Sequence, residues 1–434
     1  MRALAAMLPL LVAACGREPA PRTSAAVPAP AGGVEVRAGD DLQAAIAAAA
    51  PGSVLRLAPG EHRGPIVIDK PLVLWGPRDA VLRGGEGSTL RVVTNGARVA
   101  GLTIAGSGQR FDLMDGGVHL QGEDLVLEGV TVRDALFGVL VERCKRAIVR
   151  GNTVIGTGIP AMGLRGDGIR LWETSDSQVV DNEVRDSRDL VVWYSSRNHL
   201  QRNRVTRSRY GTHFMYSHDN VVEDSEYVAC EVGVFVMYSH DVVLRRNLLA
   251  KAGGAAGIGI GMKEAGNVTV EDNWLLANTT GVYVDASPLD PAHHNLYQRN
   301  VVRFAEAAIS LHSSLQRSEF TDNEFRDNGV VLKVGGQGDA LGCTFAGNHY
   351  DEYRGYDLDG DGRGDVPFAA RRLSTQLEGR YPELALLHGA PAMAMVDLVG
   401  EVLPLFAPRQ LLVDASPRLS PLAMTWTPEV GHAR

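Results

Sequence analysis

M-Y-S-H-D at residues 215–219, followed by M-Y-S-H-D at residues 237–241, decides the fold. The copies are 22 residues apart, so Met215 and Met237 share one position of a repeat, as do His218 and His240. In a parallel β-solenoid with one repeat per turn, equivalent residues of neighbouring turns lie about 4.8 Å apart. The repeat therefore predicts two Met–His pairs close enough to share a ligand.

The same period extends well beyond these copies. Short segments, often opened by Gly, recur mostly at steps of 21 to 24 residues and begin at residues 117, 138, 168, 190, 211, 233, 257, 281, 308 and 329. A turn Asn follows the same period at Asn152, Asn182, Asn203, Asn247, Asn273, Asn300, Asn323 and Asn348, with Asp224 in the slot after Asn203. Asn tolerates left-handed backbone and can stack at solenoid corners. We predict an all-β chain folded as a right-handed parallel β-helix.

Alternation within each segment predicts which side chains fill the bore. The first and third residues after the opening position are almost all apolar, as in Val191 and Trp193 or Ile258 and Ile260. The second and fourth then face outward, and they include Arg170, Trp172, Val192, Tyr194, His213, Met215, Phe235, Met237, Gly259, Gly261, Tyr283, Asp285, Ser310 and His312. A contiguous outer face rich in aromatic, Met and His side chains indicates a binding surface.

The first residues have the features of an export signal. Residues 1–15 join a positive start to a short apolar stretch, and V-A-A-C at 12–15 predicts a lipoprotein-type signal peptide lipidated at Cys15. The alternative is an ordinary cleavable signal with a chance Cys. Residues 16–33 are rich in Pro and Ala and predict a flexible linker. No later run approaches the roughly 18 apolar residues of a membrane-spanning helix, so we expect an exported protein, at most tethered by lipid.

The β-helix is predicted over residues 34–368, with a cap at its N-terminal end. Residues 40–50 combine an acidic N-cap with strong helix formers and predict a short helix over the apolar end of the solenoid. Residues 369–434 form a tail, with helical spacing at 377–387 and 392–405 and an extended strap at 411–414. Such an apolar segment needs a partner, so it either folds back on the solenoid or docks on a second protein.

Composition excludes several classes of protein. A net charge of −8 argues against nucleic acid as a partner, and 49 Gly with 6% aromatic residues suits a turn-rich β protein. If Cys15 carries lipid, then Cys144, Cys230 and Cys343 remain, an odd number without a C-x-x-C motif. We infer no disulfide framework and no zinc site.

Met215, His218, Met237 and His240, together with His213, form a candidate copper site. Thioether sulfur and neutral imidazole suit Cu(I) better than harder divalent ions. Whether the His side chains share the Met face depends on the intervening turn, because an offset of three residues gives opposite faces in a straight strand. Two other interpretations stay open: close packing of a duplicated coil, and a protein-docking surface in which Met is adaptable.

A second motif, Y-D-L-D-G-D-G-R-G-D at residues 356–365, predicts a calcium loop. Asp357, Asp359, Asp361 and Asp365 occupy the first, third, fifth and ninth places of such a loop, with Gly362 at the sixth. The twelfth place lacks the bidentate Glu of an EF-hand, which favours a shorter, dockerin-like loop. An acidic surface turn is the alternative.

Together these features resemble the NosD family of periplasmic maturation factors for nitrous oxide reductase. The likeness covers residues 34–422 and rests on G-L-T-I-A-G-S-G at 101–108, D-L-M-D-G-G-V at 112–118, R-G-D-G-I-R-L-W at 165–172, Y-G-T-H-F-M-Y-S-H-D at 210–219, Y-D-L-D-G-D-G at 356–362 and the apolar tail. The lipoprotein signal at Cys15 departs from the plain export signal expected in that family.

The resemblance implies a non-enzymatic exported protein that handles copper. Such a protein docks on an ABC-type permease and its ATPase and receives copper from a lipoprotein chaperone. It then helps to assemble the copper–sulfide centre of the reductase. Metal handling in the family would fall on Met and His residues, which here match Met215, His218, Met237 and His240.

A carbohydrate-active enzyme, such as a polysaccharide lyase or C5-epimerase, is the rival hypothesis, because fold alone does not fix function. It needs paired acids, or a base near Arg or Lys, in a groove. The candidates are Asp167, Arg170, Glu173, His213, Asp285 and His312. A structural docking scaffold without metal is the third hypothesis.

Overall fold

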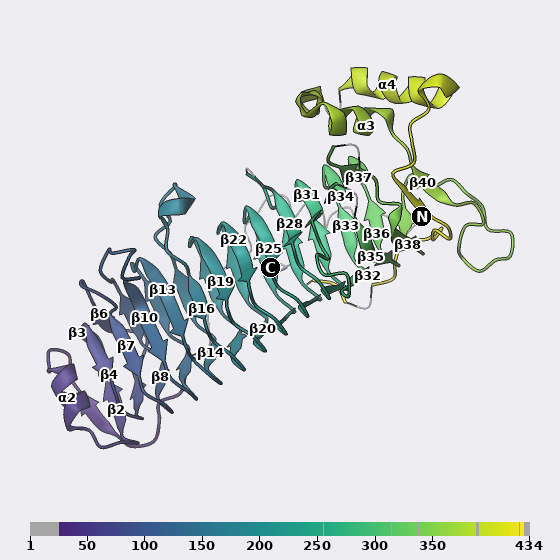
Figure 1. Ribbon diagram of the computed structural model, residues 1–434. Coiled ribbons are helices and arrows are strands. Elements are labelled where there is room, and N and C mark those ends of the chain that lie inside the picture. The colour runs from purple at the N-terminus through teal and green to yellow at the C-terminus, as the bar shows by residue number, and fades with distance from the viewer. Residues whose placement is uncertain are drawn as a thin grey trace, which may run out of the picture.

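The computed structural model describes residues 26–254, 256–313, 315–336, 338–387, 390–424 and 426–428, and over them the chain coils into three long sheets. Through most of each sheet, neighbouring strands are three elements apart in sequence, because every turn adds one strand to each face. Figure 1 shows the resulting solenoid, with α2 at one end and α3 and α4 at the other. The predicted parallel β-helix is confirmed.

The 12-stranded sheet carries both copies of the repeated Met. Its strands run in parallel from the N-terminal end as β4 (Ile66–Ile68), β7 (Leu90–Val93), β10 (Gly116–Gln121), β13 (Phe137–Glu142), β16 (Ile169–Trp172), β19 (Asp189–Trp193), β22 (Tyr210–Met215), β25 (Val232–Met237), β28 (Ile258–Lys263), β31 (Thr280–Asp285), β34 (Ala307–His312) and β37 (Val330–Val334).

The other two sheets complete each coil. A 16-stranded sheet begins at β1 (Val34–Val36) and ends at β41 (Leu412–Asp414) and β40 (Phe368–Ala370), which pair with one another in antiparallel fashion. A 13-stranded sheet runs from β3 (Gly60–Arg63) to β39 (His349–Tyr350). Apolar side chains from all three sheets form one continuous core along the bore.

A row of buried Asn side chains runs through the interior at one corner. Most of these amides bond to the Asn of the next coil, as where Asn152 Nδ2 donates to Asn182 Oδ1 over 3.0 Å. The slot after Asn203 is filled by Ser225, whose Oγ accepts from the Asn203 N–H, and not by Asp224 as predicted. Asp224 has a φ of 53°, so the charged residue before the Asn position, rather than the Asn itself, takes the left-handed turn.

Two coils face differently from the prediction. Val192 pairs with the buried Phe214 and Trp193 pairs with Met215, so Val192 fills the bore and Trp193 faces outward. This coil has no Gly at its opening position and opens at Asp189 instead. The inward and outward side chains of the strand are therefore shifted by one residue from the predicted positions.

The coil after β25 opens two residues later than predicted, at Gly259, so Ile260 fills the bore as predicted but Ile258 does not. Met262 pairs with the buried Val236 and joins the core, whereas Ile258 packs in a separate outer cluster with Val232 and Phe235. A Cβ at Gly259 would meet Leu275 of the core, so Gly259 faces the bore and is the opening residue.

The predicted N-terminal cap is confirmed as α2 (Leu42–Ala48). Asp41 is its N-cap, since its Oδ1 accepts from the Ala44 N–H at 2.9 Å. Leu42 and Ile46 are buried in the core and close the end of the bore.

One part of the tail returns to the solenoid, and the helices of the tail project from its end. It contains α3 (Leu373–Arg380), η2 (Pro382–Leu387), α4 (Pro391–Val402) and η3 (Pro404–Phe406), after which β41 returns to the 16-stranded sheet. The Asp414 carboxylate accepts from Asn348 Nδ2 at 2.9 Å and so ends the Asn row. The chain then runs back along the 13-stranded sheet, where Trp274 Nε1 donates to the Trp426 carbonyl at 3.1 Å. Among the described residues, no helix is long and apolar enough to cross a bilayer.

Candidate metal-binding site

Met215 and Met237 are direct neighbours on the outside of the 12-stranded sheet. They end β22 and β25 and pair in register, and both side chains are half-buried. Met237 also packs against the outer cluster of Val232, Phe235 and Ile258. The predicted alignment of the two sulfur side chains, one strand spacing apart, is therefore present.

His218 and His240 are also neighbours and stack face to face. Their ring centroids are 3.7 Å apart, with the planes at 16°. The His240 backbone N–H donates to His218 Nδ1 at 3.2 Å, and His240 Nδ1 lies 2.6 Å from Asp241 Oδ2. Burial, helped by the charge of His240, lowers the pKa of His218, so its ring is neutral at pH 7.

A sharp corner separates the Met pair from the His pair. Tyr216 and Tyr238, the residues after the two Met, have φ values of 50° and 49°, and the Ser217 side chain after Tyr216 is buried. The chain has thus turned the corner before His218. Tyr194, Tyr216 and Tyr238 stack along this corner with centroids 5.3 and 5.0 Å apart. Sulfur and imidazole both face outward, on either side of a tyrosine row.

His213 lies on the same strand as Met215 but is closed off from solvent. Its side chain is 5% exposed, stacked on Tyr210 at 4.5 Å and edge-on to Trp193 at 5.4 Å. Neither ring nitrogen has a hydrogen-bond partner, and Nδ1 lies 3.9 Å from Asp189 Oδ2. A metal ion could reach this ring only if the aromatic cover moved.

His293 joins the imidazole pair from a distant loop. Its ring centroid is 5.5 Å from that of His240. The loop lies between β31 and β32 (Asn295–Gln298), and its path depends on an insertion that the repeat does not specify. The only sequence signal was the H-H pair at residues 293–294.

The catalytic candidate Asp167 is buried and paired with arginine, as is the nearby Asp189. Arg188 binds Asp167 at 2.9 Å, Arg209 binds Asp189 at 2.5 Å, and neither carboxylate is exposed. Burial raises the pKa of Asp167. Burial alone would also raise the pKa of Asp189, but His213 and Arg209 hold it below its ordinary value. These acids do not face a substrate groove.

Of the remaining catalytic candidates, Arg170 lies beside Asp167 and binds its Oδ2 at 3.1 Å, whereas Asp285 and His312 lie further along the sheet. Asp285 Oδ1 binds His312 Nδ1 at 2.9 Å, but β31, which carries Asp285, is five strands along the sheet from β16. Glu173 forms a surface ion pair with Arg143.

The Asp-rich loop projects between β39 and β40. One carboxylate oxygen from each of Asp357, Asp359 and Asp361 lies within 4.8 Å of the others, and no other such group of His, Cys, Asp or Glu occurs among the described residues. Asp365 Oδ2 instead accepts from the Leu358 N–H at 2.6 Å. Backbone N–H bonds, led by that of Gly362, hold the pKa of Asp357 below its ordinary value.

The thiols do not form part of a site. Cys144 and Cys230 are buried, and burial raises the pKa of Cys144 to about 11 and that of Cys230 to about 12. Burial also raises the pKa of Cys343, to about 11. All three stay protonated at neutral pH, and protonated thiols are poor metal ligands. Cys15 lies outside the described residues.

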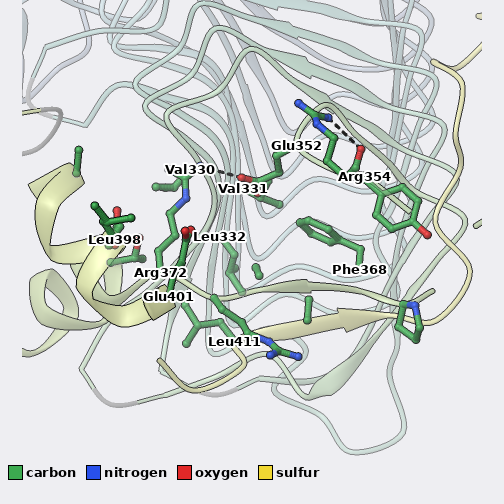
Figure 2. A pocket seen from close by; sticks show the side chains of 18 residues that line it. Val330, Val331, Leu332, Glu352, Arg354, Phe368, Arg372, Leu398, Glu401 and Leu411 are labelled. Atoms are coloured by element: carbon green, nitrogen blue, oxygen red, sulfur yellow. Dashed lines mark hydrogen bonds and ion pairs between the residues drawn. The ribbon is translucent and has the colours of Figure 1, made fainter. Parts of the chain in front are cut away.

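A cavity of about 600 Å³ lies at the opposite end of the solenoid from α2. Figure 2 shows Leu398 and Glu401 of α4 on one side of it, with Arg354 and Phe368 on the other. Arg372 lines it and binds Glu352 Oε2 at 2.8 Å. The cavity contains none of the Met or His side chains described above, and it separates α4 from the last coil.

Comparison with known proteins shows which sequences this chain is similar to. A sequence model described as "Periplasmic copper-binding protein (NosD)" matches residues 156–355, which include both M-Y-S-H-D copies. A "Probable ABC transporter binding protein NosD" from Pseudomonas aeruginosa is 26% identical over 365 residues, or 80% of this chain and 84% of that protein. The chain is similar to the NosD family over most of its length. A NosD protein of the same description from Stutzerimonas stutzeri is 31% identical over 137 residues, 31% of either chain, so this match spans less than a third of that relative.

Solved structures of enzymes share this fold. The A-module of a mannuronan C-5 epimerase from Azotobacter vinelandii superposes with a TM-score of 0.56 at 15% identity, covering 71% of this chain and 93% of that module. The catalytic unit of an α-1,3-glucanase from Streptomyces thermodiastaticus gives 0.53 at 16% identity, covering 76% and 65%. At such identities the likeness shows the fold alone.

Proposed function

We propose that this protein is a NosD-type periplasmic accessory factor, without catalytic activity, for maturation of the copper–sulfide site of nitrous oxide reductase. It accepts copper from a chaperone lipoprotein and holds it transiently as Cu(I) on the outer face of the β-helix. It works with an ABC-type permease and ATPase and passes copper to the reductase. Cys15, if lipidated, gives it a membrane anchor.

One observation carries this proposal. Two consecutive coils present identical Met and His side chains, with Met215 paired to Met237 and His218 stacked on His240. Paired thioether sulfurs with imidazole close by suit monovalent copper. The family description as copper-binding supports the same ion. Burial of Asp167 and Asp189 beneath arginines argues against the glycan-cleaving or epimerising alternative.

The apolar tail suits docking on the transporter. Met395, Leu398, Val399 and Val402 follow the i, i+3, i+4, i+7 spacing of one helical face, and all four are exposed. Such a face binds in an apolar groove of a partner. The relatives' names refer to an ABC transporter, and we propose the permease as the partner.

We expect the exported protein to bind Cu(I) stoichiometrically in competition with a chromogenic chelator. The double substitution Met215→Ala and Met237→Ala should weaken binding at least about tenfold, because each substitution removes a soft ligand. The measurement is the copper transferred from the chelator at increasing protein concentration.

The matched control replaces Met114 and Met162, which are also half-buried but lie outside the paired position, with Ala. It should bind copper like the wild-type protein. Release of uronic acid from alginate without added copper would instead support the enzyme hypothesis. Normal partner binding and copper delivery with both Met and both His removed would support the scaffold hypothesis.

We also propose that the Asp-rich loop binds calcium, through Asp357, Asp359 and Asp361 with Asp365 close by. A ligand that binds only the folded state adds about 2.7 kcal/mol of stability at 100 times its Kd. Calcium should therefore raise the thermal midpoint of the wild-type protein. It should not raise the thermal midpoint of the double variant Asp357→Asn, Asp361→Asn. In the control Asp112→Asn, which changes an exposed acid elsewhere, calcium should raise the thermal midpoint as in the wild-type protein. An equal response of all three proteins would identify the loop as an acidic surface turn.

A further inference from the structure

The stacked His pair continues into a third coil by an unexpected route. The position equivalent to His218 and His240 in the next coil is Gly266, which forms a parallel bridge with His240. Gly266 has no side chain to extend the stack. The His293 ring lies over Gly266 instead, where it reaches 5.5 Å from the His240 ring centroid.

Position 266 has no room for a side chain, because the His293 ring occupies the space beside it. A Cβ on Gly266 would lie 2.4 Å from His293 Nδ1 and 2.7 Å from its Cβ, and both distances are too short for any side chain. The backbone of Gly266 does not take a positive φ, so glycine is not needed there for conformation. The position is thus adapted to admit an imidazole from the neighbouring loop.

The nitrogen atoms of the three rings differ in what they can offer a metal. His218 Nδ1 accepts the His240 backbone N–H, so neutral His218 carries its proton on Nε2 and has no free lone pair. His240 Nδ1 donates to Asp241 Oδ2, which leaves the Nε2 lone pair free. Asp241 is itself fixed by Asn267 Nδ2, which donates to its Oδ1 at 3.2 Å. A carboxylate behind the imidazole is the usual support of a metal-binding His.

We propose that His240 and His293, rather than His240 and His218, are the imidazole ligands for copper on this face. The inference rests on the proposed copper-handling function and specifies which side chains perform it. His293 is half-buried and His240 is 41% exposed, so incoming copper can reach both. His218 has a structural part, since its ring packs on His240 and receives its backbone N–H.

The test compares His293→Gln with His294→Gln, because the two His are adjacent in the same loop and His294 is exposed. Cu(I) affinity is measured by chelator competition, and the number of nitrogen ligands by X-ray absorption at the copper edge. We expect His293→Gln and His240→Gln to lower affinity at least about tenfold and to remove one nitrogen ligand. His294→Gln and His218→Gln should change affinity less than about threefold.

Gly266→Ala provides an independent variant. Its methyl group should displace the His293 ring and reproduce the loss of one nitrogen ligand while both histidines remain in the chain. Wild-type affinity and nitrogen count in His293→Gln, or a larger loss in His218→Gln, would overturn this inference but leave copper handling intact. Failure of the wild-type protein to bind Cu(I) would overturn both.

Discussion

Asn247→Ala is expected to destabilise the β-helix by about 3 kcal/mol. Asn247 is buried in the Asn row, where its Oδ1 accepts from the Ser225 N–H at 3.0 Å and its Nδ2 donates to the Val222 carbonyl at 3.1 Å. Alanine leaves both backbone groups buried without these partners, at about 1–3 kcal/mol each. Urea unfolding followed by far-ultraviolet circular dichroism measures the loss.

Asn247→Ser is the matched control, because Ser225 occupies the equivalent position one coil earlier. Ser225 Oγ accepts from the Asn203 N–H at 3.1 Å, so a serine can replace the oxygen but not the amide donor. We expect about half the loss seen with alanine. Equal stability of all three proteins would mean that the Asn row contributes nothing to the fold.

The fold could be predicted because a β-helix repeats its physical requirements in every coil. The period of the outer Met and the inner Asn set the strand order, and the cap followed from Asp41 and the buried Leu42. The errors arose where the Gly marker of a coil was missing or duplicated. The coil at residue 190 opens without Gly, and the coil at residue 257 offers two glycines of which Gly259 is the one facing the bore.

The site could be predicted only as far as the repeat specified it. The period predicted the Met215–Met237 alignment and the His pair, but not the corner at Tyr216 that separates them. The burial of His213 depends on the aromatic rings of other coils. His293 comes from a loop inserted between coils, and no period places such a loop.

The second large effect is expected on binding of the tail to the transporter. Replacing Met395, Val402 and Leu405 together with Ser should weaken binding to the detergent-solubilised permease–ATPase complex at least about a hundredfold. These side chains are 69%, 65% and 88% exposed, and full burial of such a side chain contributes about 1.5–3 kcal/mol. Association with the immobilised complex can be measured by biolayer interferometry.

This variant should still fold, because other contacts hold the tail. Asp397 Oδ1 accepts from the Ser374 N–H at 2.8 Å and ties α4 to α3, while Met393 is the buried Met of α4. Its thermal midpoint should therefore match that of the wild-type protein.

The control replaces Leu113, Ile159 and Leu164 with Ser. These residues are 59%, 41% and 58% exposed and precede β16, far from α4 along the solenoid, so the substitutions remove apolar surface away from the proposed docking face. Transporter binding should be unchanged in this control. If the control loses binding and the tail variant keeps it, the permease contacts the flank of the β-helix, and the exposed face of α4 serves another partner. Because the Met and His pairs are far from α4 along the solenoid, copper affinity should be the same in both variants.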